Sequence, residues 1–277
     1  MMIPLEDLAC DVIGKTQRGL GLSDADLAAK ADVMQAELDE ATSEDGKPSS
    51  LVLLKLAEAL NLHGPSLVTM AEKGWAPEPV SVAGLAQFNT TWHDMTVNAY
   101  VVWDPATKEA VIFDTGADAG PLLDCVKANG LTLKAVFITH THTDHVADLP
   151  RLVAEGGHPE VFSHAKESVP GTTTFDLADS PAWSFGGLKI EPRLTWGHAE
   201  AGITYVVAGL ERPLAIVGDA VFASSMGGGK VSFADALETN RKEIFTLSDE
   251  TVICPGHGPL TTVGEEKAHN PFFPEFK

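Results

Sequence analysis

The stretch that decides the fold is His140-Thr141-His142-Thr143-Asp144-His145. It follows the apolar run Ala135-Val136-Phe137-Ile138-Thr139, which is typical of a buried strand. His140 and His142 stand two positions apart, so in an extended segment both side chains point to the same side. Asp144 and His145 fall where the chain turns into a helix. One short loop therefore offers three imidazoles and a carboxylate to a common point, and these groups suit Zn²⁺ and also Fe or Mn as ligands.

Three later strand ends repeat the pattern of a metal-capable side chain beside glycine. They are Gly197-His198, Gly218-Asp219 and Gly256-His257-Gly258. Singly, each would be an ordinary loop residue, although glycine lets the backbone approach closely there. Together with the first stretch they supply seven ligands, which is enough for two metal ions. A loop that is rich in histidine by chance would explain two such residues but not this arrangement.

Length and composition bound the class of protein. The chain has 277 residues, of which 44% are hydrophobic, enough to build a core without disulfide bonds. Its three cysteines, Cys10, Cys125 and Cys254, are odd in number and far apart, which excludes a disulfide framework and favours a reducing compartment. No run of 18 apolar residues is present and the acidic N-terminus lacks a signal-peptide pattern, so the sequence predicts a cytoplasmic protein without a membrane span. The net charge of −20 disfavours nucleic acid and anionic lipid as partners.

Two predicted domains follow from the change of pattern along the chain. Residues 1–76 contain only short helical patterns, and Ser23 is a good N-cap for one of them. The prolines of Pro77-Glu78-Pro79 mark a linker. In residues 77–277, β-branched strand patterns are mixed with helical ones, which predicts an α/β layered domain. The expected strands are 97–103, 110–113, 135–139, 203–208, 214–217 and 251–254, and the expected helices are 121–129, 144–155 and 235–247.

The order HxHxDH, then Gly-His, Gly-Asp and Pro-Gly-His-Gly resembles the metallo-β-lactamase-fold hydrolases over roughly residues 80–277. The run Ala110-Val111-Ile112-Phe113-Asp114-Thr115-Gly116 is similar to that family's strand-end aspartate ahead of the metal loop. The tail from Pro255 to Lys267, with Asn270-Pro271-Phe272 after it, resembles the glyoxalase II-like branch, which includes hydroxyacylglutathione hydrolases and related thioesterases. The resemblance implies an αββα sandwich with metal ions at one edge of its two sheets.

The resemblance also implies a role for each of the seven ligands. One metal ion would be held by His140, His142 and His198, the other by Asp144, His145 and His257, and Asp219 would bridge the two. The cofactors would be two divalent ions, Zn²⁺ first with Fe or Mn as alternatives, holding a bridging hydroxide that attacks an acyl carbonyl. Asp144 and Asp219 are then the candidate catalytic residues, Asp144 by orienting the nucleophile or handling its proton. Asp114 either fixes a ligand imidazole or caps its strand.

The N-terminal helices resemble a Cro/repressor-type helix-turn-helix in their apolar spacing, and they are expected near residues 5–14, 24–31, 34–41, 51–60 and 65–73. The resemblance would make 34–42 the recognition helix. That helix carries Gln35, Glu37, Asp39 and Glu40 but no Lys or Arg. Residues 1–76 hold six Lys and Arg against thirteen Asp and Glu, and phosphate contacts need cations, so we expect no DNA binding. The hypothesis is that these helices pack on the hydrolase domain, cover its mouth or form a homodimer.

The leading functional hypothesis is a dinuclear metal-dependent hydrolase of a thioester, or of a related acyl ester or lactone, with a small-molecule acyl substrate. A persulfide dioxygenase with one iron is an alternative, because it would share the site made by His140, His142, His198 and Asp219. A third hypothesis, of another class, is a transcriptional regulator whose metal-binding domain is the sensor. The acidic recognition helix argues against that regulator.

Four further residues lie near the ligands in sequence. Tyr205 and Phe222 either line the pocket or belong to the sheet core, and the core is the favoured interpretation. Cys254 is interpreted as strand core. An anionic substrate would need a local cationic patch, and the sequence locates none. Lys230, which follows three glycines, is interpreted as a surface residue.

Overall fold

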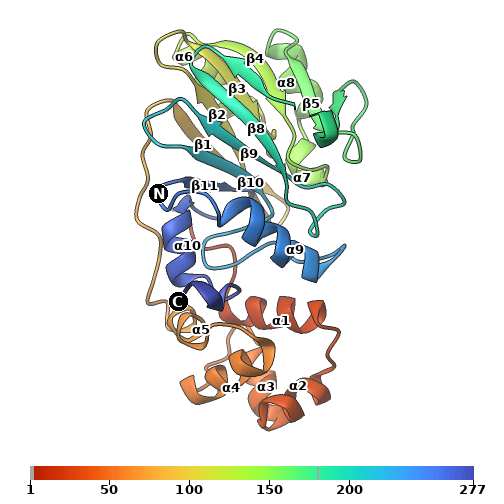
Figure 1. Ribbon diagram of the computed structural model, residues 1–277, viewed down its shortest axis with the longest axis vertical. Coiled ribbons are helices and arrows are strands. Elements are labelled where there is room, and N and C mark those ends of the chain that lie inside the picture. The colour runs from red at the N-terminus through yellow and green to blue at the C-terminus, as the bar shows by residue number, and fades with distance from the viewer. Residues whose placement is uncertain (1–2, 180) are drawn as a thin grey trace.

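The computed structural model describes residues 3–179 and 181–277. Figure 1 shows a layered body in which two β-sheets face each other, with the group of helices α1 to α5 at one end of the molecule. This arrangement confirms the predicted αββα sandwich preceded by N-terminal helices. Helix α5 ends at Ala71 and strand β1 begins at Leu85. The division into domains at residues 76 and 77 stays a prediction.

The first sheet carries the loop that decides the fold. Its strand order is β1-β2-β3-β4-β5-β6, antiparallel from β1 to β3 and parallel from β3 to β6. Along β4, Ala135 and Phe137 face the interior between the sheets, whereas Val136 faces the outer helices. The strands are β1 Leu85–Trp92, β2 Met95–Trp103, β3 Glu109–Phe113, β4 Thr132–Phe137, β5 Glu160–His164 and β6 Thr173–Phe175.

The second sheet supplies the other strand ends that the sequence singled out. Its order is β12-β11-β10-β9-β8-β7, and only the β10–β11 pair is parallel among the strands described. Strands β10 and β11 therefore end at the same edge of the sheet. The strands are β7 Trp183–Phe185, β8 Leu188–Leu194, β9 Ile203–Ala208, β10 Leu214–Gly218, β11 Val252–Pro255 and β12 Thr261–Thr262.

Buried aromatic rings join the two sheets. Phe113 and Phe137 of the first sheet contact Tyr205 of the second, with ring centroids 5.5 and 5.2 Å away. Helices α6 and α8 cover the outer face of the first sheet through Leu122 and Leu152, and α9 and α10 lie over the second. The remaining elements are α6 Gly120–Ala128, α7 Thr143–Val146, α8 Leu149–Glu155, η1 Leu177–Asp179, α9 Phe233–Thr239, the π-helical η2 Asn240–Ile244, α10 Val263–His269 and η3 Pro274–Phe276.

The N-terminal helices share a hydrophobic core with the body. Val12 and Ile13 belong to the same buried cluster as Met226, Phe233 and Phe272, so α1 packs directly on the helical layer of the second sheet. The burial of these side chains gives the two parts a joint interior. The helices are α1 Ala9–Gly19, α2 Asp24–Ala31, α3 Gln35–Ala41, α4 Ser50–Leu60 and α5 Gly64–Ala71.

Some expected elements have different bounds in the structure. The first helix runs over residues 9–19 rather than 5–14. The single helix expected over 144–155 is split into α7 and α8, because Asp148 leaves helical geometry and a new helix begins at Leu149 with Pro150 in its first turn. The predicted Ser23 cap is confirmed, since Ser23 Oγ accepts the Asp26 N–H, and Ser49 Oγ caps α4 in the same way by accepting the Val52 N–H. Among the described residues, no helix is both long and apolar enough to cross a membrane.

Candidate metal centre

All seven predicted ligands lie together at one edge of the two sheets. Each of them follows the carboxyl end of a strand, so the facing sheets bring loops from distant parts of the chain to one place. His140 and His142 follow β4, Asp144 and His145 belong to α7, His198 follows β8, Asp219 follows β10 and His257 follows β11. The side chains form two groups in which potential ligand atoms lie within 4.8 Å of one another.

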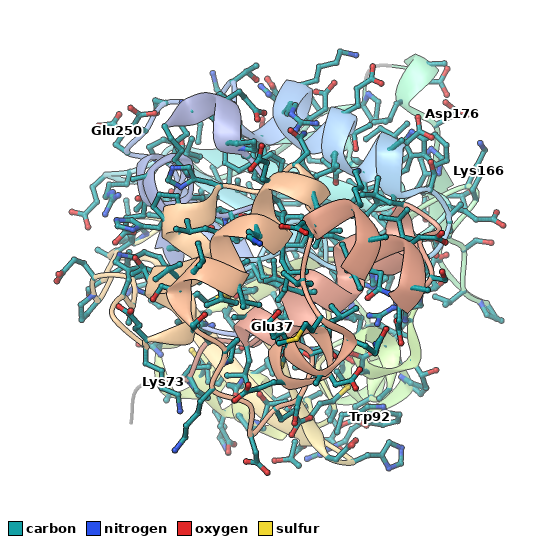
Figure 2. All side chains as sticks on the ribbon, turned by 90° about the horizontal axis from the view of Figure 1, so that it is seen from below. Glu37, Lys73, Trp92, Lys166, Asp176 and Glu250 are labelled. Atoms are coloured by element: carbon teal, nitrogen blue, oxygen red, sulfur yellow. The ribbon has the colours of Figure 1, made fainter. Side chains whose placement is uncertain are left out.

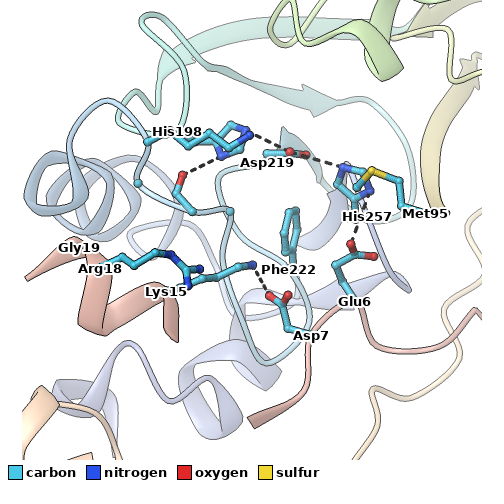
Figure 3. A pocket seen from close by; sticks show the side chains of 14 residues that line it. Glu6, Asp7, Lys15, Arg18, Gly19, Met95, His198, Asp219, Phe222 and His257 are labelled. Carbon is cyan, nitrogen blue, oxygen red and sulfur yellow. Dashed lines mark hydrogen bonds and ion pairs between the residues drawn. The ribbon is translucent and has the colours of Figure 1, made fainter. Parts of the chain in front are cut away.

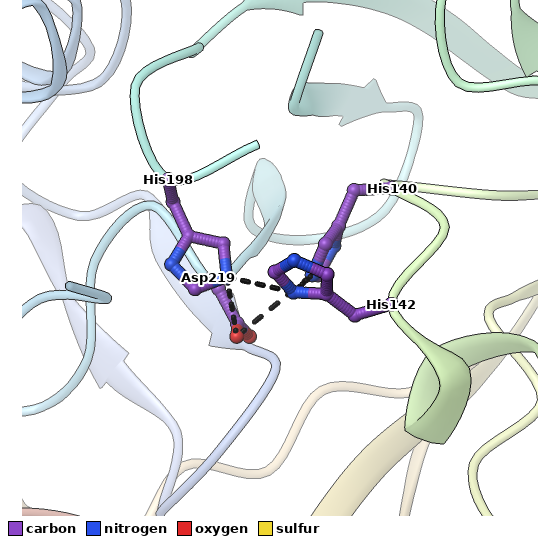
Figure 4. Close-up of side chains that lie close together, drawn as sticks. All are labelled: His140, His142, His198 and Asp219. Atoms are coloured by element: carbon purple, nitrogen blue, oxygen red, sulfur yellow. Dashed lines mark hydrogen bonds and ion pairs between the residues drawn. The ribbon is translucent and has the colours of Figure 1, made fainter. Parts of the chain in front are cut away.

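The first group consists of His140, His142, His198 and Asp219 (Figure 4). His142 Nδ1 lies 3.0 Å from both His140 Nε2 and His198 Nε2. Asp219 Oδ2 lies 3.2 Å from His198 Nε2 and 3.8 Å from His140 Nε2. The four side chains therefore direct one nitrogen or oxygen each toward a common point.

The second group consists of Asp144, His145 and His257. Asp144 Oδ2 lies 3.5 Å from His145 Nε2 and 3.4 Å from His257 Nε2. Asp219 contacts this group too, since its Oδ1 is 3.3 Å from His145 Nε2 and its Oδ2 is 3.5 Å from His257 Nε2. Asp219 therefore stands between the two groups, where the resemblance places a bridging ligand.

Two features of the site fit divalent metal ions. A tetrahedral ion with bonds of about 2.0–2.1 Å places its ligand atoms roughly 3.3 Å apart, and the contacts among these side chains span 3.0 to 3.8 Å. His145 Nε2 and Asp219 Oδ1 are buried side-chain atoms that have no hydrogen-bond partner in the described part of the chain. Such atoms are costly to bury unless a ligand or an ion satisfies them.

Asp114 fixes the orientation of a predicted ligand. The residue is buried at the end of β3 with φ +55°, a left-handed conformation that Asp tolerates better than most side chains. Its Oδ1 accepts the backbone N–H of Thr139 at 2.8 Å, and its Oδ2 accepts the hydroxyl of Thr139 at 2.8 Å. The same Oδ2 lies 2.8 Å from His145 Nδ1. Asp114 thus holds the His145 ring with Nε2 facing the site, and it also ties down the residue before His140.

Backbone carbonyls hold two other rings in the same way. His198 Nδ1 lies 2.9 Å from the Gly228 carbonyl oxygen, and His257 Nδ1 lies 2.6 Å from that of Thr96. A ring whose Nδ1–H is donated to a carbonyl presents the lone pair of Nε2, the form in which imidazole binds a metal. The structure therefore orients both rings for ligation.

Burial and the charges of the site lower the pKa values of some of its histidines and raise those of others. Burial by itself would lower the pKa of His145, but Asp219 and Asp114 raise it to about 10. Burial would also lower the pKa of His257, but Asp219 and Asp144 raise it to about 11. Burial, with His145 nearby, holds the pKa of His140 well below its usual 6.5. A metal ion must displace the protons of His145 and His257, so metal affinity falls as the pH is lowered.

Residues that the sequence did not single out complete the site. Glu167 accepts the backbone N–H of Thr141 at 3.0 Å and that of Ala201 at 3.4 Å, so one carboxylate ties the loop of His140 to the loop of His198. Asn98 Nδ2 donates to the Pro255 and Gly258 carbonyls and thereby holds the loop of His257. A polar residue inside the apolar run 97–103 was the signal for Asn98, whereas nothing in the sequence marked Glu167.

A cavity of about 610 Å³ opens onto the site (Figure 3). Phe222 lines it with its ring centroid 5.5 Å from that of His257, so the interpretation of Phe222 as sheet core is wrong. Tyr205 and Cys254 are fully buried between the sheets, as interpreted. Lys230 also lines the cavity. The wall of the cavity that faces the metal ligands comes from the N-terminal segment. No sequence motif indicated this wall.

A family model described as the metallo-beta-lactamase superfamily matches residues 94–257. The chain belongs to the metallo-beta-lactamase superfamily. The matched segment contains all seven predicted ligands and leaves helices α1 to α5 outside.

Relatives in the superfamily include metallo-hydrolases. One, named as a probable metallo-hydrolase of Streptococcus pyogenes, is 31% identical over an alignment of 199 residues that covers 63% of this chain and 84% of the relative. The hydroxyacylglutathione hydrolase GloC of Haemophilus influenzae is 28% identical over 197 residues, 63% of this chain and 92% of that protein. The crystal structure of ETHE1 from Myxococcus xanthus superposes with a TM-score of 0.59 at 25% identity and covers 69% of this chain and 85% of that one. The chain is therefore similar to enzymes of this superfamily in both sequence and fold.

Proposed function

We propose that the protein is a dinuclear metal-dependent hydrolase that cleaves a thioester, or a related acyl ester or lactone. One observation carries the proposal: two adjacent groups of buried ligand-type side chains share Asp219, whose carboxylate lies within 3.5 Å of His145, His198 and His257. A carboxylate shared between two such groups suits a pair of metal ions better than a single one.

Each predicted ligand has a place in this proposal. One ion would be held by His140, His142 and His198, and the other by Asp144, His145 and His257. Asp219 would contribute to both. Divalent ions at this position supply a water of lowered pKa as the nucleophile and polarise the acyl carbonyl.

The chain's own residues orient the reaction. Asp114 and the carbonyl of Gly228 keep His145 and His198 in fixed tautomers, so these rings do not have to rearrange when substrate enters. Asp144 would accept a proton from the nucleophile and pass it to the leaving group, because it belongs to one ligand group only, whereas Asp219 contacts both groups.

A thioester is the substrate class that two similarities favour. The tail after His257 resembles the glyoxalase II-like branch, and GloC, at 28% identity, is named a hydroxyacylglutathione hydrolase. Cleavage of a thioester expels a thiolate, which is a better leaving group than the alkoxide of an ester or a lactone. The proposal is accordingly a glyoxalase II-like thioesterase.

A mononuclear iron persulfide dioxygenase is the second candidate. The structural similarity to ETHE1 supports it, and the group of His140, His142, His198 and Asp219 would suffice for one iron. This candidate requires no metal at Asp144, His145 and His257, so the metal content of the protein separates the two functions.

The deciding experiment is elemental mass spectrometry of the freshly purified protein. We expect two equivalents of Zn, Fe or Mn per chain, falling toward one in His257→Ala. The matched control is His269→Ala, because His269 stacks on Trp75 and belongs to neither ligand group. One equivalent of iron in the wild type and in His257→Ala would refute the dinuclear hydrolase and favour the dioxygenase. A thioester and lactone panel then tests the activity itself.

A further inference from the structure

The cavity over the metal centre has two walls of different origin. His198, Asp219 and His257 line one wall, and Lys15 and Arg18 of helix α1 line the other (Figure 3). Helix α1 lies outside the segment that matches the superfamily, which begins at residue 94. Whatever binds in this cavity is therefore contacted by a part of the chain that the superfamily match does not include.

Helix α1 is held firmly against the catalytic body. Lys15 Nζ donates to the Met226 carbonyl at 2.9 Å and pairs with Asp7, whose Oδ2 also accepts the Ser225 hydroxyl at 2.5 Å. At the end of the helix, a Cβ added to Gly19 would lie 2.2 Å from Cγ of Phe233, so the backbone packs directly on that ring. The wall made by α1 is thus a built part of the cavity.

The cations of this cavity differ in their partners. Lys15 is neutralised by Asp7 and is 15% exposed. Arg18 and Lys230 are exposed, and within residues 3–179 and 181–277 neither side chain has an ion pair or a hydrogen bond. The chain has a net charge of −20. An excess of basic residues therefore does not explain why two cations without partners line the same cavity.

We propose that Arg18 and Lys230 bind an anionic group of the substrate, a carboxylate or a phosphate, while the reacting carbonyl lies at the metal centre. This inference rests on the proposed hydrolase function. A guanidinium and an ammonium that share one anion form charge-assisted hydrogen bonds, and the planar guanidinium fork matches either oxyanion. Substrates of this enzyme are then anionic acyl compounds, despite the acidic surface of the molecule.

The remaining charges give the anion one orientation. Glu6 also lines the cavity, with its Oε1 4.0 Å from His257 Nδ1. A carboxylate beside His257 repels an anionic group, which leaves the side of the cavity with Arg18, away from Glu6 in Figure 3, as the favourable position. Arg18 also lies in the last turn of α1, where a cation stabilises the helix dipole. That structural role would be insensitive to the charge of the substrate.

The test compares matched pairs of thioesters in the metal-loaded full-length protein. One pair is the glutaryl thioester of N-acetylcysteamine and its methyl ester, with the carboxylate on the acyl side. The other is the butyryl thioester of 3-mercaptopropionate and its methyl ester, with the carboxylate on the thiol side. We expect kcat/KM for one anionic member to exceed that of its neutral partner by about 10-fold to 100-fold, the range for hydrogen bonds to charged groups.

Variants then assign the preference to the two cations. Arg18→Gln and Lys230→Gln should each remove most of the ratio between the anionic and the neutral member. Arg212→Gln should retain it, because Arg212 binds the Glu250 carbonyl away from the cavity. Both members of a pair are measured on the same protein, so a loss of fold or metal cancels in the ratio. A ratio that is the same in the wild type, Arg18→Gln and Lys230→Gln would overturn the inference.

Binding separates a failure of this inference from a failure of the proposed function. If the wild type cleaves no thioester, the hydrolase proposal fails, and calorimetry with glutarate and with inorganic phosphate decides the anion site. Binding of either anion that weakens about tenfold in Arg18→Gln, a loss typical of one charged hydrogen bond, supports the site and identifies the anion. Equal affinities in the wild type and the variant overturn it.

Discussion

At the scale of single residues, the position of Asp114 is the clearest link between sequence and chemistry. One carboxylate binds the Thr139 N–H, the Thr139 hydroxyl and the His145 ring, all at 2.8 Å. It therefore couples the end of β4 to a ligand that lies in α7. The sequence left open whether Asp114 caps its strand or fixes an imidazole, and the structure shows that it fixes the His145 ring and binds the residue that follows the neighbouring strand β4.

Asp114→Asn tests this coupling. Asn tolerates the left-handed backbone of this position, but its amide places a donor against the N–H groups of Thr139 or His145. We expect metal affinity to fall by about 10-fold to 100-fold, as for other partners of metal-bound histidine, in a competition titration with a chromophoric chelator. The control is Asp118→Asn, because Asp118 is an exposed partner of Arg151. Unchanged affinity in Asp114→Asn, with native near-UV circular dichroism, would contradict the role.

At the scale of elements, helix α10 connects the C-terminal part of the chain to the loop after Asp219. Glu266 on α10 is fully buried and accepts hydrogen bonds from the Ser224 N–H, the Asn270 amide and the Thr261 hydroxyl, at 2.8 to 2.9 Å. Burial raises the pKa of Glu266 to about 7, although the three hydrogen bonds oppose the rise. The folded protein therefore keeps a proton on Glu266 that the unfolded chain releases nearer pH 4.5.

A pH dependence of stability follows from this raised pKa. Between pH 4.5 and 7 the native state binds more protons at Glu266 than the unfolded state, so its contribution to the free energy of unfolding falls as the pH rises. Glu266→Gln replaces the protonated acid and keeps its shape. Between pH 5 and 8 we expect the variant to gain stability relative to the wild type, by about 3 kcal/mol at most. Urea denaturation of both proteins at the two pH values measures the difference, and parallel behaviour would contradict it.

At the scale of the whole molecule, helix α1 and the segment before it form one wall of the cavity over the metal centre. Of the three alternatives for the N-terminal helices, the burial of Val12 and Ile13 with Phe233 and Phe272 agrees with packing on the second domain, whereas a cover over its mouth and a homodimer stay predictions. Figure 2 views the molecule from this end, with Glu37 of the expected recognition helix labelled. Gln35, Asp39 and Glu40 of the same helix are exposed, and Gln35 is hydrogen-bonded to Asp39 at 2.8 Å. The surface that would face a DNA groove is therefore acidic.

The full-length protein should not bind DNA. Its net charge of −20 repels a phosphate backbone, and residues 34–42 offer no Lys or Arg for phosphate contacts. Fluorescence anisotropy with a labelled duplex at low salt should show no change up to micromolar protein. Nanomolar binding that weakens with added salt would instead favour the transcriptional regulator.

The sequence by itself determined the α/β class and the candidate ligands, and the resemblance of its motifs to the metallo-β-lactamase-fold hydrolases implied the sandwich. Their signal is local, because His140 and His142 follow an apolar strand at a spacing that puts both on one side, and a glycine stands next to His198, Asp219 and His257. Strand β8 was not foreseen, although buried Leu188 and Ile190 alternate with exposed residues, because Pro192 argues against a strand there.

Only the tertiary structure decided how distant segments meet. Glu167 ties two ligand loops across 26 and 34 positions, and Lys15 reaches Met226 across 211, so no spacing rule could connect them. The same holds for Arg18 and Lys230, which line one cavity from distant parts of the chain. The physical reason is that a strand-end motif is set by the backbone of a few residues, whereas a cavity wall depends on the packing of whole helices against a sheet.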